Sequence, residues 1–154
     1  MLQAAKATED ARRDELLKEL DGLRGKLVEA QQNSETTPMV IAADAKIRQV
    51  RNDMPGAAAK WQEYFAKVPQ PPADAFVWAT LVSRAQGDLG LAMQYATRGA
   101  EAHPSEVRLA IQRAELALQL GRMEEAAGLY DSLAKALPDQ QQFVQMAAEL
   151  QARV

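Results

Sequence analysis

The stretch Ala-Gln-Gly-Asp at residues 85–88 returns in altered form as Gln-Leu-Gly-Arg at residues 119–122. One spacing of 34 residues separates three pairs of landmarks: Gly87 and Gly121, Ala92 and Ala126, Pro104 and Pro138. Three coincident landmarks at one period predict an array of structural repeats. In such an array each unit buries its apolar face against its neighbours, because a single unit cannot bury that face alone.

The composition favours helices in these repeats. Hydrophobic residues make up 47% of the 154 residues, with Ala and Leu dominant, and aromatic residues only 5%. Ala and Leu are strong helix formers, whereas strands prefer β-branched and aromatic side chains. Gly and Pro fall mostly between the periodic segments, where they punctuate helices. We therefore expect an all-α fold.

The repeat resembles the tetratricopeptide repeat, a helix–turn–helix unit of 34 residues. The first clear unit covers residues 73–106 and the second covers residues 107–140. The resemblance implies that Gly87 and Gly121 lie in the turns between helices, and that the alanines 34 residues apart are the small contacts between them. It also implies a right-handed superhelix, a solenoid of helical hairpins, preceded here by a long N-terminal helix.

The flanks of the two clear units are also expected to be helical. Residues 38–72 are similar to a degenerate hairpin, with Ala57 at the small contact and Trp61 at the large position of the second helix. We expect residues 53–56 to separate its helices and the second helix to begin near Ala57. Residues 141–154 are expected to form a capping helix, because a repeat array must end with a polar outer surface.

Residues 1–32 are predicted to form one long amphipathic helix that resembles a coiled-coil strand. Its apolar stripe recurs at spacings of four and three residues and consists of Leu16, Leu20, Leu23 and Leu27. Two interpretations remain open for this stripe. It packs against the following helices, or it drives self-association into a homo-oligomer.

The side chains needed for catalysis or metal binding are scarce. The chain has no cysteine, and His103 is its one histidine. Metal sites and nucleophile–base sets need several such groups close together. We therefore expect no catalytic residue, no cofactor and no metal, and a protein that is not an enzyme.

Charge and hydropathy restrict the partners. The net charge is −3, and no segment gathers the Lys and Arg needed to neutralise a nucleic-acid backbone. No apolar run reaches the roughly 20 residues that span a bilayer, so direct membrane insertion is not expected. The compartment stays open between the bacterial periplasm, with an anchor upstream of Met1, and the cytoplasm.

The family resemblance implies a concave groove formed by the first helix of each unit. The groove positions are Asp74, Val77, Leu81, Arg84 and Ala85 in the first unit, and Arg108, Ile111, Glu115, Leu118 and Gln119 in the second. Four of them would form an apolar strip: Val77, Leu81, Ile111 and Leu118. Arg84 and Arg108 could pair with a carboxylate or a chain end of the ligand. In the alternative interpretation, the N-terminal or the last helix fills this groove.

These features favour a non-catalytic scaffold or adaptor that binds a protein or peptide through the groove. A bacterial envelope assembly factor, anchored upstream, is one concrete version of this function. The alternative is an oligomerisation module of a larger protein, self-associating through the N-terminal helix. A third option, an enzyme or its regulatory subunit, would need a pocket for a substrate, cofactor or metal.

Overall fold

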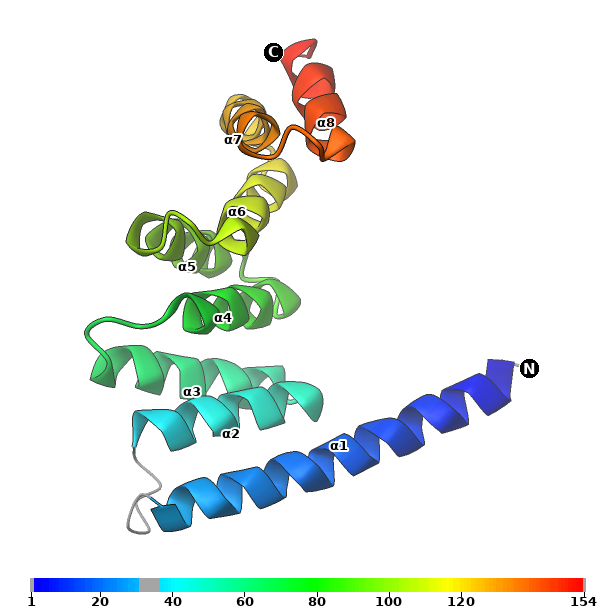
Figure 1. Ribbon diagram of the computed structural model, residues 1–154, viewed down its shortest axis with the longest axis vertical. Helices are drawn as coiled ribbons and strands as arrows, with labels where there is room; N and C mark the ends of the chain where they lie inside the picture. Colours follow the sequence, from blue (N-terminus) through cyan, green and yellow to red (C-terminus); the bar gives the residue numbers. More distant parts are fainter. Residues whose placement is uncertain (1, 31–36, 154) are drawn as a thin grey trace. The chain divides into compact units, whose positions relative to one another are not determined.

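The computed structural model describes the backbone of residues 2–30 and 37–153, and the side chains of residues 10–29 and 37–153 (Figure 1). These ranges contain eight helices and no strand, so the all-α prediction is confirmed. The helices are α1 (Leu2–Ala30), α2 (Pro38–Val50), α3 (Met54–Lys67), α4 (Ala73–Ala85), α5 (Leu89–Ala102), α6 (Val107–Gln119), α7 (Met123–Ala136) and α8 (Gln141–Gln151).

The chain divides into two compact units, with the boundary between Pro71 and Pro72. The first unit contains α1, α2 and α3, and the second contains α4 to α8. In the second unit, α4 and α5 lie within residues 73–106, α6 and α7 lie within residues 107–140, and α8 follows them.

In the first unit, α2 and α3 form a hairpin and α1 packs against α2. The helix α3 begins at Met54, three residues earlier than expected. The cause is Asp53, whose side-chain carboxylate accepts the backbone N–H of Gly56 at 3.0 Å and so satisfies a free amide of the first turn. Pro55 fits in this first turn because its missing N–H would have no partner there.

The α2–α3 hairpin is closed by small and aromatic side chains. Ala57 is fully buried, as expected for the residue at which the two helices touch, and Trp61 is 2% exposed. The Trp61 ring meets the Tyr64 ring edge-on, with 5.6 Å between the ring centroids. An aromatic pair in this geometry contributes attraction beyond its buried area.

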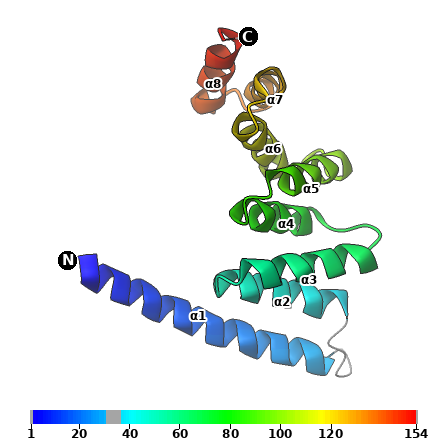
Figure 2. The same ribbon diagram turned by 180° about the vertical axis from the view of Figure 1, so that it is seen from behind.

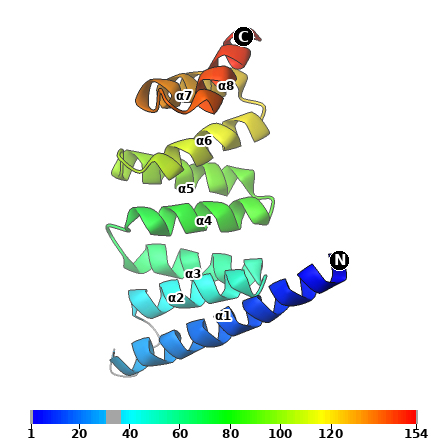
Figure 3. The ribbon, with the colours of Figure 1, turned by 45° about the vertical axis from the view of Figure 1, so that its right-hand side comes forward.

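The second unit consists of helices that reverse direction at each turn (Figure 3). The turns after α4 and α6 contain Gly87 at φ 81° and Gly121 at φ 70°. This left-handed backbone conformation favours glycine, which has no β-carbon to clash. Asn52 adopts φ 62° in the matching turn after α2, and asparagine tolerates this conformation better than most residues. The sequence analysis did not assign that role to Asn52.

The core of the second unit is built around small residues at the repeat positions. Ala92 and Ala126 are both fully buried, as predicted for the contacts between paired helices. The final helix α8 packs against α7 through Phe143, Ala147 and Leu150, and its exposed side is mainly polar, with Val144 as an exposed apolar residue. The helix α8 thus covers one side of α7 at the end of the second unit.

Candidate functional site

A cavity of about 420 Å³ lies between α4 and α6, the first helices of the two clear repeats. Its walls are mainly apolar side chains, with charged groups at the two ends. The lining residues are Val77, Trp78, Leu81, Arg84, Arg108, Ile111, Gln112 and Glu115. This cavity is named the α4–α6 groove below.

The 34-residue period sets the register of the two helices that form this groove. Asp74 and Arg108 hold the same position in successive repeats, and the Arg108 Nη2 atom donates to Asp74 Oδ1 at 2.8 Å. Helices α4 and α6 are in contact, so equivalent positions come within reach of one another. A positive and a negative side chain at equivalent positions therefore form an ion pair across the groove.

A second ion pair crosses the same groove further along. The Arg84 Nη1 atom donates to Glu115 Oε2 at 2.6 Å, and about a third of the arginine side chain is exposed. The sequence analysis predicted Arg84 and Arg108 as partners for a ligand carboxylate. In the structure each guanidinium already pairs with carboxylates of the same chain.

Arg108 is also bound to the turn that precedes its own helix. Its Nε and Nη2 atoms donate to the two carboxylate oxygens of Glu106, both at 2.8 Å. The side chain of Arg108 and then its backbone N–H, which donates to the same carboxylate, lower the pKa of Glu106 from 4.5 to about 2. Glu106 thus stays ionised over the whole neutral range.

Gln112 is the polar group inside the groove that the sequence analysis missed. It is 8% exposed, and its Nε2 atom donates a long hydrogen bond to the Val77 carbonyl at 3.4 Å. Its Oε1 atom is buried and accepts no hydrogen bond. A buried acceptor without a partner is costly, so this amide favours an added donor.

The structure brings together six of the predicted groove residues as lining: Val77, Leu81, Arg84, Arg108, Ile111 and Glu115. Asp74 stands at the rim, held by Arg108. Ala85 and Gln119 are exposed outside the lining, and Leu118 packs against the core of the second unit instead. Trp78, like Gln112, was not predicted. Trp78 follows Val77 in a largely apolar helix, so nothing in the sequence indicated that its side chain faces the groove.

A smaller cavity of about 210 Å³ continues from the groove toward α7 and α8. It shares Ile111 and Glu115 with the α4–α6 groove and is completed by Tyr130, Gln142, Phe143 and Met146. Burial raises the pKa of Tyr130, the nearby Glu115 carboxylate raises it further, and Arg84 lowers it. The ion pair between Arg84 and Glu115 therefore stands where the two cavities meet.

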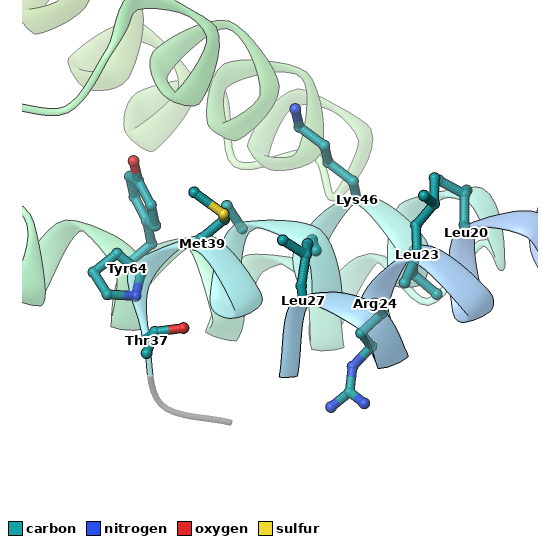
Figure 4. Close-up of a pocket in the computed structure, with 12 residues that line it drawn as sticks. Leu20, Leu23, Arg24, Leu27, Thr37, Met39, Lys46 and Tyr64 are labelled. Carbon is teal, nitrogen blue, oxygen red and sulfur yellow. The ribbon is translucent and has the colours of Figure 1, made fainter. Parts of the chain in front are cut away.

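A third cavity, of about 620 Å³, lies in the first unit between α1 and α2 (Figure 4). Leucines from α1 and apolar side chains from α2 line it, together with Tyr64 of α3. Ion pairs from Arg24 to Asp44 and from Arg51 to Asp21 join α1 to α2. The Arg13 Nε atom donates to the carbonyl of Val50, the last residue of α2, at 3.0 Å, and the N-terminal part of α1 extends beyond the end of α2 (Figure 2).

The leucine stripe of α1 is divided between two environments. Leu20 and Leu27 are partly buried and line the cavity between α1 and α2, which agrees with packing against the following helices, and Leu23 lines this cavity as well. Leu16 and Leu23 are 48% and 50% exposed. Leu16 is not part of that lining, so the apolar surface that α1 leaves open consists of Leu16 and the exposed half of Leu23.

The described residues also bear on metal binding and on membrane-spanning helices. Within these residues, no group of three His, Asp or Glu side chains is arranged to hold a metal ion. His103 lies beside Phe76, with 6.0 Å between the ring centroids. No helix in the described part of the chain is both long and apolar enough to cross a bilayer.

Comparisons with known proteins bear on the fold alone. No protein-family model matches the sequence, and no curated protein matches it. Solved structures do match, at low sequence identity. YrrB, described as a tetratricopeptide protein with an unusual peptide-binding site, has a TM-score of 0.73 and 16% identity, over 97% of this chain and 82% of its own.

Two further structures agree with this assignment. The tetratricopeptide domain of Arabidopsis OM64 has a TM-score of 0.64 and 14% identity, over 76% of this chain and 96% of its own. The TPR2B domain of yeast Sti1, solved in complex with pHsp70, has the same TM-score and identity over 79% of this chain and 100% of its own. The fold is therefore that of the tetratricopeptide-repeat class, as the sequence predicted.

Proposed function

We propose that this chain is a non-catalytic scaffold that binds an extended segment of a partner protein in the α4–α6 groove. The observation that carries the proposal is the groove itself. It combines an apolar wall with the amide of Gln112, whose buried Oε1 atom accepts no hydrogen bond and would be satisfied by a backbone N–H of a bound segment if the side chain turned toward the groove. Structures of the same fold include one with a described peptide-binding site and one in complex with pHsp70.

The dimensions of the groove fit a short extended segment. On α4 the lining runs from Val77 to Arg84, seven residues apart, and a helix rises about 1.5 Å per residue. The lining is therefore roughly 10 Å long, which matches about three extended residues at about 3.3 Å each. Val77, Leu81 and Ile111 supply apolar contacts along this length.

A site-specific crosslinker tests the position of the partner. A benzophenone side chain at position 111 lies in the groove, whereas one at Ser132 is on the exposed surface of α7. We expect the position-111 protein, expressed in its native host, to form one discrete crosslinked product, with the crosslinked residues of the partner in an extended segment. Equal products from both positions, or none from position 111, would contradict the proposal.

The exposed leucines of α1 favour a second candidate function, self-association as an oligomerisation module. Leu16 and Leu23 are seven residues apart and both about half exposed, a spacing typical of a helix-pair seam. Light scattering on the full chain and on the Leu16→Ser, Leu23→Ser variant tests this candidate. A monomeric mass for both proteins would eliminate it.

An envelope assembly factor, anchored upstream of Met1, is a narrower version of the scaffold proposal. It is supported by the long, largely polar helix α1 that precedes the repeats. Fractionation of the native host with an antibody to this chain tests it. Recovery of the protein only from the cytosolic fraction would contradict it.

A further inference from the structure

We propose that Glu115 masks Arg84, so that the α4–α6 groove binds an uncharged apolar segment and rejects segments that carry a carboxylate. This inference rests on the proposed function of the groove and specifies the chemistry of its partner. It differs from the sequence expectation, in which Arg84 and Arg108 would bind a ligand carboxylate.

The first step concerns Arg84. Its guanidinium is 2.6 Å from a Glu115 oxygen, a short charge-assisted contact. A ligand carboxylate that reached Arg84 would have to displace Glu115. The displaced Glu115 would then lie beside the incoming negative charge without its cationic partner, and the two like charges would repel. The ion pair therefore opposes an anionic ligand at this end of the groove.

The second step concerns Arg108, at the other end. Its guanidinium donates to both oxygens of Glu106 and to Asp74, all at 2.8 Å. Among the residues that line the groove, Arg84 and Arg108 are the two cations, and both are already neutralised. A bound carboxylate would find no unpaired positive charge in the described groove.

The third step concerns what the groove does offer. Between the two ion pairs lie apolar side chains and the amide of Gln112, whose Oε1 atom lacks a donor. A peptide backbone N–H supplies that donor without any charge on the ligand. An extended segment with apolar side chains and no Asp, Glu or chain end in the groove therefore fits all three features.

The two arginines provide a matched test, because Arg84 depends on Glu115 alone, whereas Arg108 pairs with both Asp74 and Glu106. Removing the carboxylate of Glu115 by Glu115→Ala frees Arg84, which has no other acceptor among the residues that the structure describes. Removing the carboxylate of Asp74 by Asp74→Ala leaves Arg108 held by Glu106. Alanine is a strong helix former, and both positions are about half exposed, so both variants should fold.

The experiment is a selection of linear peptides from a phage-displayed random library, carried out on the wild-type chain and on both variants. We expect the wild-type protein and Asp74→Ala to enrich apolar peptides depleted in Asp and Glu. We expect Glu115→Ala to enrich peptides with an Asp or Glu. In titrations of labelled synthetic peptides, this variant should prefer the acidic form over its amide counterpart by about tenfold.

The outcomes separate this inference from the proposed function. Acid-containing peptides selected by the wild-type protein, or the same preference in all three proteins, would overturn the masking of Arg84 while leaving the groove as a binding site. An Ile111→Glu variant, in which the new charge blocks the groove, serves as the control. If the wild-type protein enriches no peptides that this variant does not also enrich, the proposed function fails, and this inference fails with it.

Discussion

Gly99 of α5 lies so close to Phe76 of α4 that a β-carbon on Gly99 would stand 2.7 Å from the Phe76 β-carbon. The same added atom would stand 2.9 Å from a methyl group of Leu109 in α6. Atoms of neighbouring side chains do not approach this closely without displacement. The two helices that line the groove, α4 and α6, therefore meet α5 at this glycine, and the missing β-carbon permits their close approach.

We expect Gly99→Ala to destabilise the protein by about 1–3 kcal/mol, because the new methyl group overpacks this junction. The gain in helix propensity, about 1 kcal/mol, offsets only part of this cost. Urea unfolding followed by circular dichroism measures the change.

Gly128→Ala is the matched control. Gly128 also lies within a helix, but no atom stands within 4 Å of an added β-carbon. Here we expect stabilisation by up to about 1 kcal/mol. Equal effects of the two substitutions would contradict the close packing at Gly99.

Helix capping gives a second prediction. Asp53 and Asp88 cap α3 and α5 by accepting backbone N–H groups at 3.0 and 2.9 Å, whereas Arg122 at the start of α7 makes no such bond. With Glu125 at the third helical position, Arg122→Ser creates a capping box. We expect a gain of about 0.5–1 kcal/mol, measured as a higher midpoint in urea.

The reciprocal change tests the same physical cause. Asp88→Ala removes the bond to the Leu91 N–H and should cost about 1 kcal/mol. If Arg122→Ser lowered the stability, the ion pair between Arg122 and Glu125, which this substitution removes, would contribute more than the new cap.

The pKa of Glu106 gives a prediction for acid pH. In the folded state this pKa is about 2, compared with an ordinary value of 4.5. A lowered folded-state pKa means that the contribution of Glu106 to stability is complete above about 4.5. It is then lost as the pH falls toward 2, because the unfolded state takes up the proton first.

The melting temperature of wild type relative to Glu106→Gln measures this contribution. We expect wild type to melt higher at pH 6, and the difference between the two proteins to shrink steadily from pH 4.5 to pH 2. A difference that is constant over this range would show that the pairing with Arg108 does not stabilise the fold.

The attachment of α1 to α2 gives a fourth prediction. Arg24 and Asp44 form a partly buried ion pair, so Arg24→Ala leaves the Asp44 carboxylate without its arginine partner. We expect hydrogen exchange of α1 between Arg13 and Glu29 to accelerate about five- to tenfold, equivalent to roughly 1 kcal/mol. Arg12→Ala, at an exposed position on the same helix, should leave the exchange unchanged.

Much of the fold could be predicted because it depends on spacing. Gly87 and Gly121 had to lie in turns and Ala92 and Ala126 in helix contacts once the period was recognised, and the structure places them there. The turn position of Asn52 was not predicted, because an extra residue puts it 35 positions before Gly87 instead of 34. Asparagine is also a weaker signal of such a turn than glycine.

The interior of the groove was harder to predict. The repeat indicated which helix positions face the groove. It did not indicate that Glu115, on the opposite helix, neutralises Arg84. Such pairs depend on side-chain conformations and on the distance between two particular helices, which periodicity does not contain. The same is true of Gln112, whose unpaired oxygen is a property of its surroundings and not of its sequence position.

The most direct test of the account is a fluorescence anisotropy titration of a labelled apolar peptide, taken from the wild-type selection, against the full chain and two charge variants. Ile111→Glu puts a charge into the α4–α6 groove, whereas Ser132→Glu adds the same charge to the exposed surface of α7. With helicity verified by circular dichroism, we expect Ile111→Glu to weaken binding more than about tenfold and Ser132→Glu to leave it unchanged. Equal affinities of the two variants for the peptide would contradict the claim that this groove is the binding site.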